Sequence, residues 1–217
     1  MATSSRPTTS VPQDSISDFL QRHGRAVGLV AGALLVVGGA VAAWRWNQTS
    51  QGTRAEAAYF QALNTPGADE NPARAEAALR QVASGYDGTS GGAQAQMMLA
   101  QILFDQGKYQ DGVRLLQNAS DAPEALRPGV QLLTAAGYEG LNRFAEAAKL
   151  YEAQAASARA ESTRDQMLAN AARAYAAGND RVNAARLWQQ LATREGAPIA
   201  DEARVRLGEL AAQQAGR

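Results

Sequence analysis

The feature that most constrains this chain is an uninterrupted apolar stretch near its N-terminus, residues 26–43, with the sequence AVGLVAGALLVVGGAVAA. Arg25 precedes it, and Arg45 follows it. An α-helix rises about 1.5 Å per residue, so the residues between these two arginines would extend over roughly 28 Å. That length is close to the thickness of the hydrocarbon core of a bilayer. The stretch therefore predicts a transmembrane helix over residues 26–44.

Two alternatives to a permanent membrane anchor stay open. A buried core helix is also apolar on all sides, but it is usually shorter and is not bounded by polar, turn-prone segments. A cleaved signal peptide would use the small residues at Val41, Ala42 and Ala43, although its apolar run is usually only about 7 to 15 residues long. Trp44 and Trp46 favour the anchor, because indole rings prefer the headgroup layer of a membrane.

Two glycines in this stretch, Gly28 and Gly32, have the spacing G-x-x-x-G. Small residues at this spacing let a second transmembrane helix approach closely. They are the candidate residues for a helix contact in the membrane, which would join two copies into a homo-oligomer or hold another protein. The alternative is that glycine and alanine are simply frequent in this segment.

The segments on either side of the stretch are polar. Residues 1–25 form a leader, in which residues 1–13 are rich in Ser, Thr and Pro and are expected to be disordered. From Asp14 onward the pattern predicts a short amphipathic helix that leads into the membrane. Residues 45–52 are polar and are expected to form a linker.

The orientation of the span depends on a close comparison of charges. Arg22 and Arg25 precede the span, and Arg45 and Arg54 follow it. Positive residues favour the cytoplasmic side, so equal numbers on both sides do not determine the orientation of the span. We predict that the N-terminus lies in the cytoplasm.

Composition excludes several classes of protein. Lys and Arg number 21, as do Asp and Glu, so no net charge attracts nucleic acid. Cysteine is absent, which excludes disulfides, thiolate catalysis and cysteine-ligated zinc. His23 is the only histidine, so neither a histidine metal cluster nor a Ser-His-Asp relay can form. We expect no enzymatic activity, no cofactor and no metal.

Residues 53–217 have the pattern of an all-α repeat domain. Apolar residues recur at i, i+3, i+4 and i+7, and pairs of such segments are separated by turn residues at Gly107, Asn142 and Asn179. Small residues recur in phase with these turns, as in Ala100 and Ala135. The pattern predicts an α-solenoid of about four helical hairpins, followed by a C-terminal capping helix that opens at Pro198.

This spacing resembles the tetratricopeptide repeat, a helix-turn-helix unit of about 34 residues. The resemblance covers residues 93–198 in three units, and residues 53–85 form a looser unit with a long loop. The chain departs from the pattern at Thr134, where a large apolar residue is usual, and at Arg181, where an aromatic residue is usual.

The order of these features is similar to a narrower family. An amphipathic leader, a glycine-rich span, an exit of Trp44-Arg45-Trp46-Asn47 and a series of hairpins resemble the YfgM-like ancillary subunits of the bacterial Sec translocon. The resemblance implies a single-pass inner-membrane protein whose repeat domain lies in the periplasm. It also implies contacts with Sec translocon subunits and periplasmic chaperones.

The first helix of each hairpin in a solenoid lines the concave face, where such domains commonly bind peptides or helices. For Met97 and Phe104 the alternative is ordinary core packing, and for Glu139 and Arg173 it is a solvated helix face. The candidate partner-binding residues on the concave face are Gln94, Met97, Gln101, Phe104, Leu132, Glu139 and Arg173.

The sequence therefore predicts a membrane-anchored scaffold for protein-protein interaction, acting as an ancillary subunit of the Sec translocon. An alternative with the same architecture is an adaptor for envelope assembly or cell-wall machinery with other partners. An enzyme would need carboxylates that converge in a closed pocket, which no spacing in the sequence indicates.

Overall fold

The structure is a computed structural model. It describes the backbone of residues 14–67, 72–194 and 196–215, and the side chains of residues 33–67, 72–119, 121–194 and 196–212. By its internal contacts the chain divides into two compact units, residues 1–50 and residues 51–217. Every regular element of the described residues is a helix, which confirms the all-α prediction.

The described residues of the N-terminal unit belong to helix α1 (Asp14–Leu63), which continues into the second unit. None of the helices, in the part of the chain that is described, is both long and apolar enough to cross a membrane. The side chains of residues 26–32, at the start of the predicted span, are not among those described, and the predicted helix contact at Gly28 and Gly32 falls in this part of the chain. The predicted disordered tail, residues 1–13, lies outside them as well.

Residues 45–52, expected to form a linker, are helical and belong to α1. Polar side chains here turn back onto their own helix. The hydroxyl of Thr49 donates to the carbonyl of Arg45 at 2.9 Å, and that of Ser50 donates to the carbonyl of Asn47 at 3.0 Å. Hydroxyls that bond one turn back leave the backbone ladder intact, so polarity alone did not end the helix.

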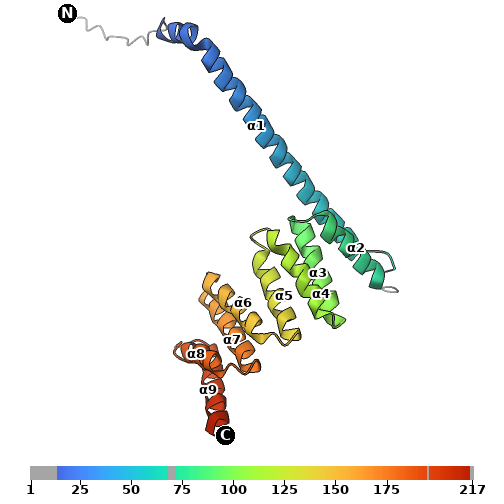
Figure 1. The fold of residues 1–217 in the computed structure, drawn as a ribbon, viewed down its shortest axis with the longest axis vertical. Coiled ribbons are helices and arrows are strands. Elements are labelled where there is room, and N and C mark those ends of the chain that lie inside the picture. Colours follow the sequence, from blue (N-terminus) through green and yellow to red (C-terminus); the bar gives the residue numbers. More distant parts are fainter. Residues whose placement is uncertain (1–13, 68–71, 195, 216–217) are drawn as a thin grey trace, which may run out of the picture. The chain divides into compact units, whose positions relative to one another are not determined.

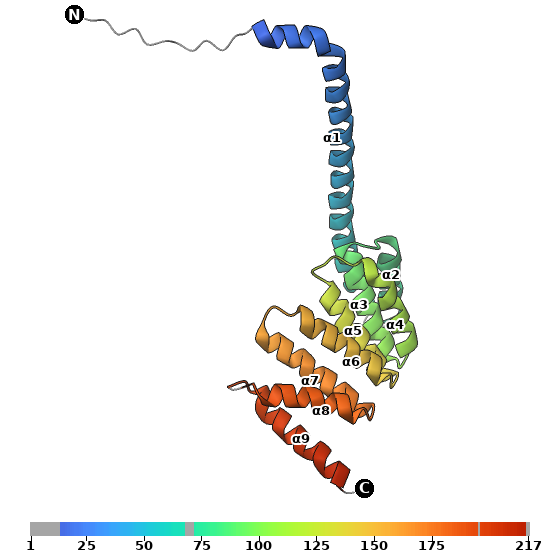
Figure 2. The ribbon, with the colours of Figure 1, turned by 60° about the vertical axis from the view of Figure 1, so that its left-hand side comes forward.

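The second unit is a series of helical hairpins, as predicted. The end of α1 pairs with α2 to form the first hairpin, three further hairpins follow, and a last helix closes the series (Figure 1). Consecutive helices from α2 to α9 contact one another in chain order, which both views show (Figure 2). The helices are α2 (Pro72–Gly85), α3 (Ser90–Asp105), α4 (Tyr109–Asn118), the 3-10 turn η1 (Ala119–Asp121), α5 (Arg127–Gly140), α6 (Phe144–Ser157), α7 (Glu161–Ala177), α8 (Arg181–Ala192) and α9 (Ile199–Ala215).

The turns of the last three hairpins repeat one backbone geometry. Gly107, Asn142 and Asn179 lie where the sequence predicted a turn, and all three have a left-handed backbone, with φ of 75°, 57° and 60°. The N–H of the next residue donates to the carbonyl five residues back at 2.8 Å in each case, for example from Lys108 to Leu103. This is the Schellman arrangement, which glycine and asparagine favour because they tolerate the left-handed region.

Small residues allow the helices to approach closely. A Cβ added at Gly91 of α3 would lie 2.3 Å from the backbone carbonyl of Ala55 in α1. One added at Gly137 of α5 would lie 2.5 Å from the rings and methyls of Phe104 and Val113. The alanines predicted at helix crossings, including Ala135, are fully buried. The small size of the glycine and alanine side chains at these positions therefore sets the distance between helices.

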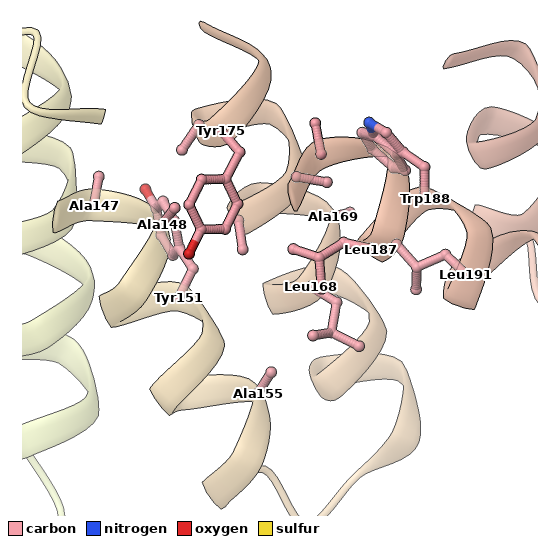
Figure 3. Close-up of a cluster of buried hydrophobic side chains, with 14 of the residues drawn as sticks. Ala147, Ala148, Tyr151, Ala155, Leu168, Ala169, Tyr175, Leu187, Trp188 and Leu191 are labelled. Carbon is pink, nitrogen blue, oxygen red and sulfur yellow. The ribbon is translucent and has the colours of Figure 1, made fainter. Parts of the chain in front are cut away.

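Larger side chains fill the space that remains between hairpins. In the C-terminal core, Leu187, Trp188 and Leu191 of α8 point toward α7 (Figure 3). Alanines of α6 and α7 belong to the same core. Trp188 and Leu191 are at most 1% exposed. Ala203 of α9 joins this core, so the last helix covers the apolar end of the series, as a capping helix does.

The unusual Thr134 is accommodated without an unsatisfied hydroxyl. Its side chain is buried, and its hydroxyl donates to the carbonyl of Val130 at 2.7 Å. A buried hydroxyl that is hydrogen-bonded within its own helix avoids most of the penalty of desolvation. The departure from the repeat pattern is therefore compatible with the repeat fold.

The close contact of α1 with α3 predicts that Gly91→Ala is destabilising. The new methyl group would meet backbone atoms, which cannot rotate away, so we expect a loss of about 1 to 3 kcal/mol in the free energy of unfolding. The matched control is Gly208→Ala in α9, where no atom lies within 4 Å and alanine favours the helix by about 1 kcal/mol. Chemical denaturation of both variants checks this. Equal stability of the two variants would contradict the packing argument.

Candidate functional site

An apolar groove of about 600 Å³ lies along the first helices of the hairpins. It is lined from the end of α1, from α3, and from α5 with the residue that precedes it. No charged side chain lines it among the residues that the structure describes. The lining residues are Tyr59, Gln94, Met97, Met98, Gln101, Leu126, Gly129, Leu132, Leu133 and Ala136.

The wall contributed by α3 follows from its helical register. Gln94, Met97, Met98 and Gln101 are spaced at i, i+3, i+4 and i+7, which places them along one face. Thr89 starts this helix by accepting a hydrogen bond from the backbone N–H of Gly92 at 3.1 Å. The cap defines where the helix begins.

The floor between α3 and α5 depends on a glycine. The terminal methyl of Met97 lies 2.9 Å from the position that a Cβ would take at Gly129. The side chain of Met97 therefore lies directly over the backbone of α5. A larger residue at Gly129 would displace this methionine and change the shape of the groove.

Four of the seven residues that the sequence placed on the concave face line this groove: Gln94, Met97, Gln101 and Leu132. The sequence reasoning missed most of the wall from α5 and the contribution of α1. A signal was present for Leu133 and Ala136, since they continue the apolar face of Leu132 and Gly129 by helical spacing. No comparable signal marked Tyr59, which reaches the groove because α1 packs against the repeat helices.

Phe104 lies in the core rather than in the groove. It is 7% exposed and packs against Gly112 and Gly137, and its ring stacks on Tyr109 with 5.6 Å between the ring centroids. Ordinary core packing, the alternative that the sequence left open, is therefore what the structure shows for this residue.

Glu139 lies at the junction of α5 and α6 and contacts a buried tyrosine. It accepts a hydrogen bond from the hydroxyl of Tyr151. Burial raises the pKa of Glu139, and this hydrogen bond lowers it by a smaller amount. Burial, together with the charge of Glu139, raises the pKa of Tyr151 to about 12. The tyrosine is therefore a neutral donor that ties the two helices together at physiological pH.

The same kind of bond recurs one helix later, between Tyr175 of α7 and Glu152 of α6. Burial and the hydrogen bond to Glu152 raise the pKa of Tyr175 to about 12. Glu152 also pairs with Arg186 of α8, with 3.0 Å between nitrogen and oxygen. Carboxylate–tyrosine bonds thus connect consecutive helices on the second half of the series.

Arg173 makes its contacts within the protein. Its guanidinium donates to both carboxylate oxygens of Glu202 on α9, at 2.7 and 2.8 Å, and to Asn170 at 2.9 Å. It also lies over the ring of Trp188, 5.8 Å from the centroid. These bonds hold the capping helix, and the part that Arg173 plays in partner binding stays a prediction.

A larger hollow of about 820 Å³ lies where α7, the α8–α9 loop and α9 meet. Its charged groups already have partners: Arg194 contacts Asp165 at 3.3 Å and Glu161 at 3.4 Å, and Glu202 pairs with Arg173 at 2.7 Å. Paired charges leave little for a ligand to satisfy, so the smaller apolar groove is the better candidate site.

Within the described residues, no group of three or more His, Cys, Asp or Glu side chains could hold a metal ion.

The chain matches the family model described as a tetratricopeptide repeat-like domain over residues 17–136, more than half of its 217 residues. The chain belongs to the tetratricopeptide repeat-like domain family. The match contains every residue that lines the groove. No curated protein is similar enough to the chain to count as a match.

Membership of this family points to a scaffold for protein-protein interaction. Repeat domains of this kind are typically binding modules rather than enzymes, and they bind through extended surfaces formed by stacked helices. Protein partners in general therefore follow from the family, and the apolar groove is the candidate surface for them.

The pKa of Glu139 is raised and that of Glu146 is lowered, so replacing each by glutamine should have opposite effects on stability. Glu139, whose pKa is raised, favours folding most below its unfolded pKa and loses this contribution as pH rises through its folded pKa. Glu139→Gln, which retains an acceptor for Tyr151, should therefore melt at a higher temperature than the parent at pH 7. Its advantage should disappear as pH falls below the ordinary glutamate pKa.

Glu146→Gln is the matched control with the opposite sign. The hydrogen bond from Arg143 lowers the pKa of Glu146, so its contribution is present above its unfolded pKa and is lost as pH falls through its folded pKa. This variant should melt at a lower temperature than the parent at pH 7, and the difference should vanish in acid. Thermal melts at pH 7 and at low pH measure both. A melting temperature of Glu139→Gln below that of the parent at pH 7 would contradict the raised pKa of Glu139.

Proposed function

We propose that this protein is a membrane-anchored scaffold of the bacterial inner membrane that docks protein partners on its repeat domain. Its N-terminus lies in the cytoplasm and its repeat domain in the periplasm. The partners are subunits of the Sec translocon and periplasmic chaperones. The role is recognition without chemistry: anchoring raises the effective concentration of the repeat domain near other membrane-bound proteins.

The observation that carries the docking role is the apolar groove. Its lining is contributed by three consecutive first helices, and Met98 in its wall remains 37% exposed. Exposed apolar surface that is gathered in a groove is typical of a binding site, because burying it in a complex is favourable.

The exposed side chains of α1 support the membrane anchor. Leu34, Leu35, Val36 and Val37 are consecutive, and each is between 61% and 78% exposed. Consecutive helical residues are about 100° apart, so these four point to all sides of the helix. A partner helix would cover one side only, whereas lipid covers every side. The tryptophans after this segment, both exposed, suit a headgroup layer.

The choice of partners rests on the resemblance to YfgM-like subunits, which combines the tryptophan–arginine exit with the hairpin series. An envelope-assembly or cell-wall adaptor would have the same architecture. Partner identity therefore separates the two functions, and groove variants connect the partner to the site.

Affinity purification of the full chain from gently solubilised membranes should recover Sec subunits or a periplasmic chaperone. Met98→Glu should reduce this recovery by about tenfold, since it places a charge in an apolar contact. The matched control is Val182→Glu on α8, a residue that is 81% exposed and does not line the groove.

Quantitative mass spectrometry of the eluates from the parent, both variants and a chain without residues 1–44 provides the measurement. Recovery of cell-wall or envelope-assembly proteins in place of Sec subunits would move the function to the alternative adaptor. Recovery no greater than that of a chain without residues 1–44 would remove the basis of the translocon assignment.

The proposed orientation can be measured independently with reporters fused after Arg217. A reporter that is active only in the periplasm should be active, and one that is active only in the cytoplasm should be silent. The opposite pattern would place the repeat domain in the cytoplasm and dismiss periplasmic partners.

A further inference from the structure

The described lining of the groove offers a partner few hydrogen-bonding groups. Among the described residues that line it, only Tyr59, Gln94 and Gln101 have polar groups in their side chains, and the amide of Gln101 donates to Asp105 at 3.0 Å. The remainder of the lining is methionine, leucine, alanine and glycine. A segment bound here must therefore satisfy most of its own polar groups.

An extended peptide does not meet this requirement. Each of its residues carries a backbone N–H and C=O, and each such group that is buried without a partner costs about 1 to 3 kcal/mol. An α-helix pairs these groups internally and presents only side chains. The groove therefore favours a helix over an extended strand.

The absence of charge in the described lining restricts the kind of ligand further. Acidic tails and C-terminal carboxylates are recognised by Arg or Lys side chains or by backbone N–H groups that point at the anion. The described lining contains no charged residue. Electrostatic complementarity therefore selects an uncharged, apolar face.

The two methionines suit such a face. Met97 and Met98 have flexible, polarisable side chains that adapt to apolar groups of different shape. The terminal methyl of Met97 lies close to Gly129 of α5, which has no side chain at this point of the groove. A surface of this kind accepts the apolar face of a helix without demanding one sequence.

We propose that the groove between α1, α3 and α5 binds the uncharged apolar face of an amphipathic helix of a partner protein. The inference rests on the proposed scaffold function and specifies the chemistry of the partner at that same site. It excludes an extended peptide and an acidic tail as the main ligand.

The test uses the full chain in nanodiscs of neutral phospholipid and three fluorescent peptides of identical composition. The first is an amphipathic helix with Leu and Met on one face and Gln and Ser on the other. The second has the same sequence with two central residues in the D form, which breaks the helix. The third is scrambled so that the apolar residues surround the helix. Anisotropy measures binding after subtraction of the signal from empty nanodiscs.

The amphipathic helix should bind at least about tenfold more tightly than the other two peptides. Met98→Glu and Ala136→Glu should each weaken its binding by about tenfold, because both residues line the groove and are exposed enough to be replaced without disturbing the core. Val182→Glu should leave binding within about twofold of the parent.

Three results would overturn the inference: equal binding of the D-substituted peptide, equal binding of Met98→Glu, or no binding of any peptide. The scaffold proposal is judged separately by the purification experiment. If partners are recovered in a Met98-dependent way while the peptides fail, the scaffold stands and the helical ligand is wrong. If the peptides bind as expected but no Sec subunit or chaperone is recovered, the named partners are wrong and the ligand class stands.

Discussion

The repeat unit depends on how closely its helices approach one another. Gly91 lies against the carbonyl of Ala55, and Gly137 leaves room for the ring of Phe104. Alanines occupy equivalent crossings in the later hairpins and are fully buried. Because interiors are closely packed, the absence or small size of these side chains sets the helix spacing, and larger residues such as Trp188 then fill the remaining volume.

This spacing, together with a repeated turn, produces the candidate binding surface. The left-handed residues at Gly107, Asn142 and Asn179 reverse the chain in the same way after each first helix. The first helices α3 and α5 consequently contact each other directly, and the end of α1 contributes Tyr59 to the same groove. The candidate binding surface thus arises from local turn geometry and from small residues at the crossings.

The two units expose apolar side chains in different ways. In α1 the exposed residues Leu34 to Val37 surround the helix, which suits a solvent that is apolar on all sides. In the repeat unit the exposed Met98 belongs to a groove on one side, which suits a protein partner of limited size. We therefore assign lipid to the first surface and a partner helix to the second, as proposals that rest on these exposures.

The sequence by itself determined the features that local chemistry controls. Apolar spacing predicted the hairpins, the turn residues at Gly107, Asn142 and Asn179, and the capping helix after Pro198, because helix formation and chain reversal depend on residues a few positions apart. Register along a single helix likewise placed Gln94, Met97 and Gln101 together in the groove.

Only the tertiary structure decided which contacts the other predicted residues make. Phe104 is in the core because Gly137, far along the chain, leaves space for it. Glu139 meets Tyr151 of the next helix, and Arg173 is held by Glu202, which is 29 residues away. Helical spacing gives the direction of a side chain but not the element that packs against it, so these partners are set by the stacking of hairpins.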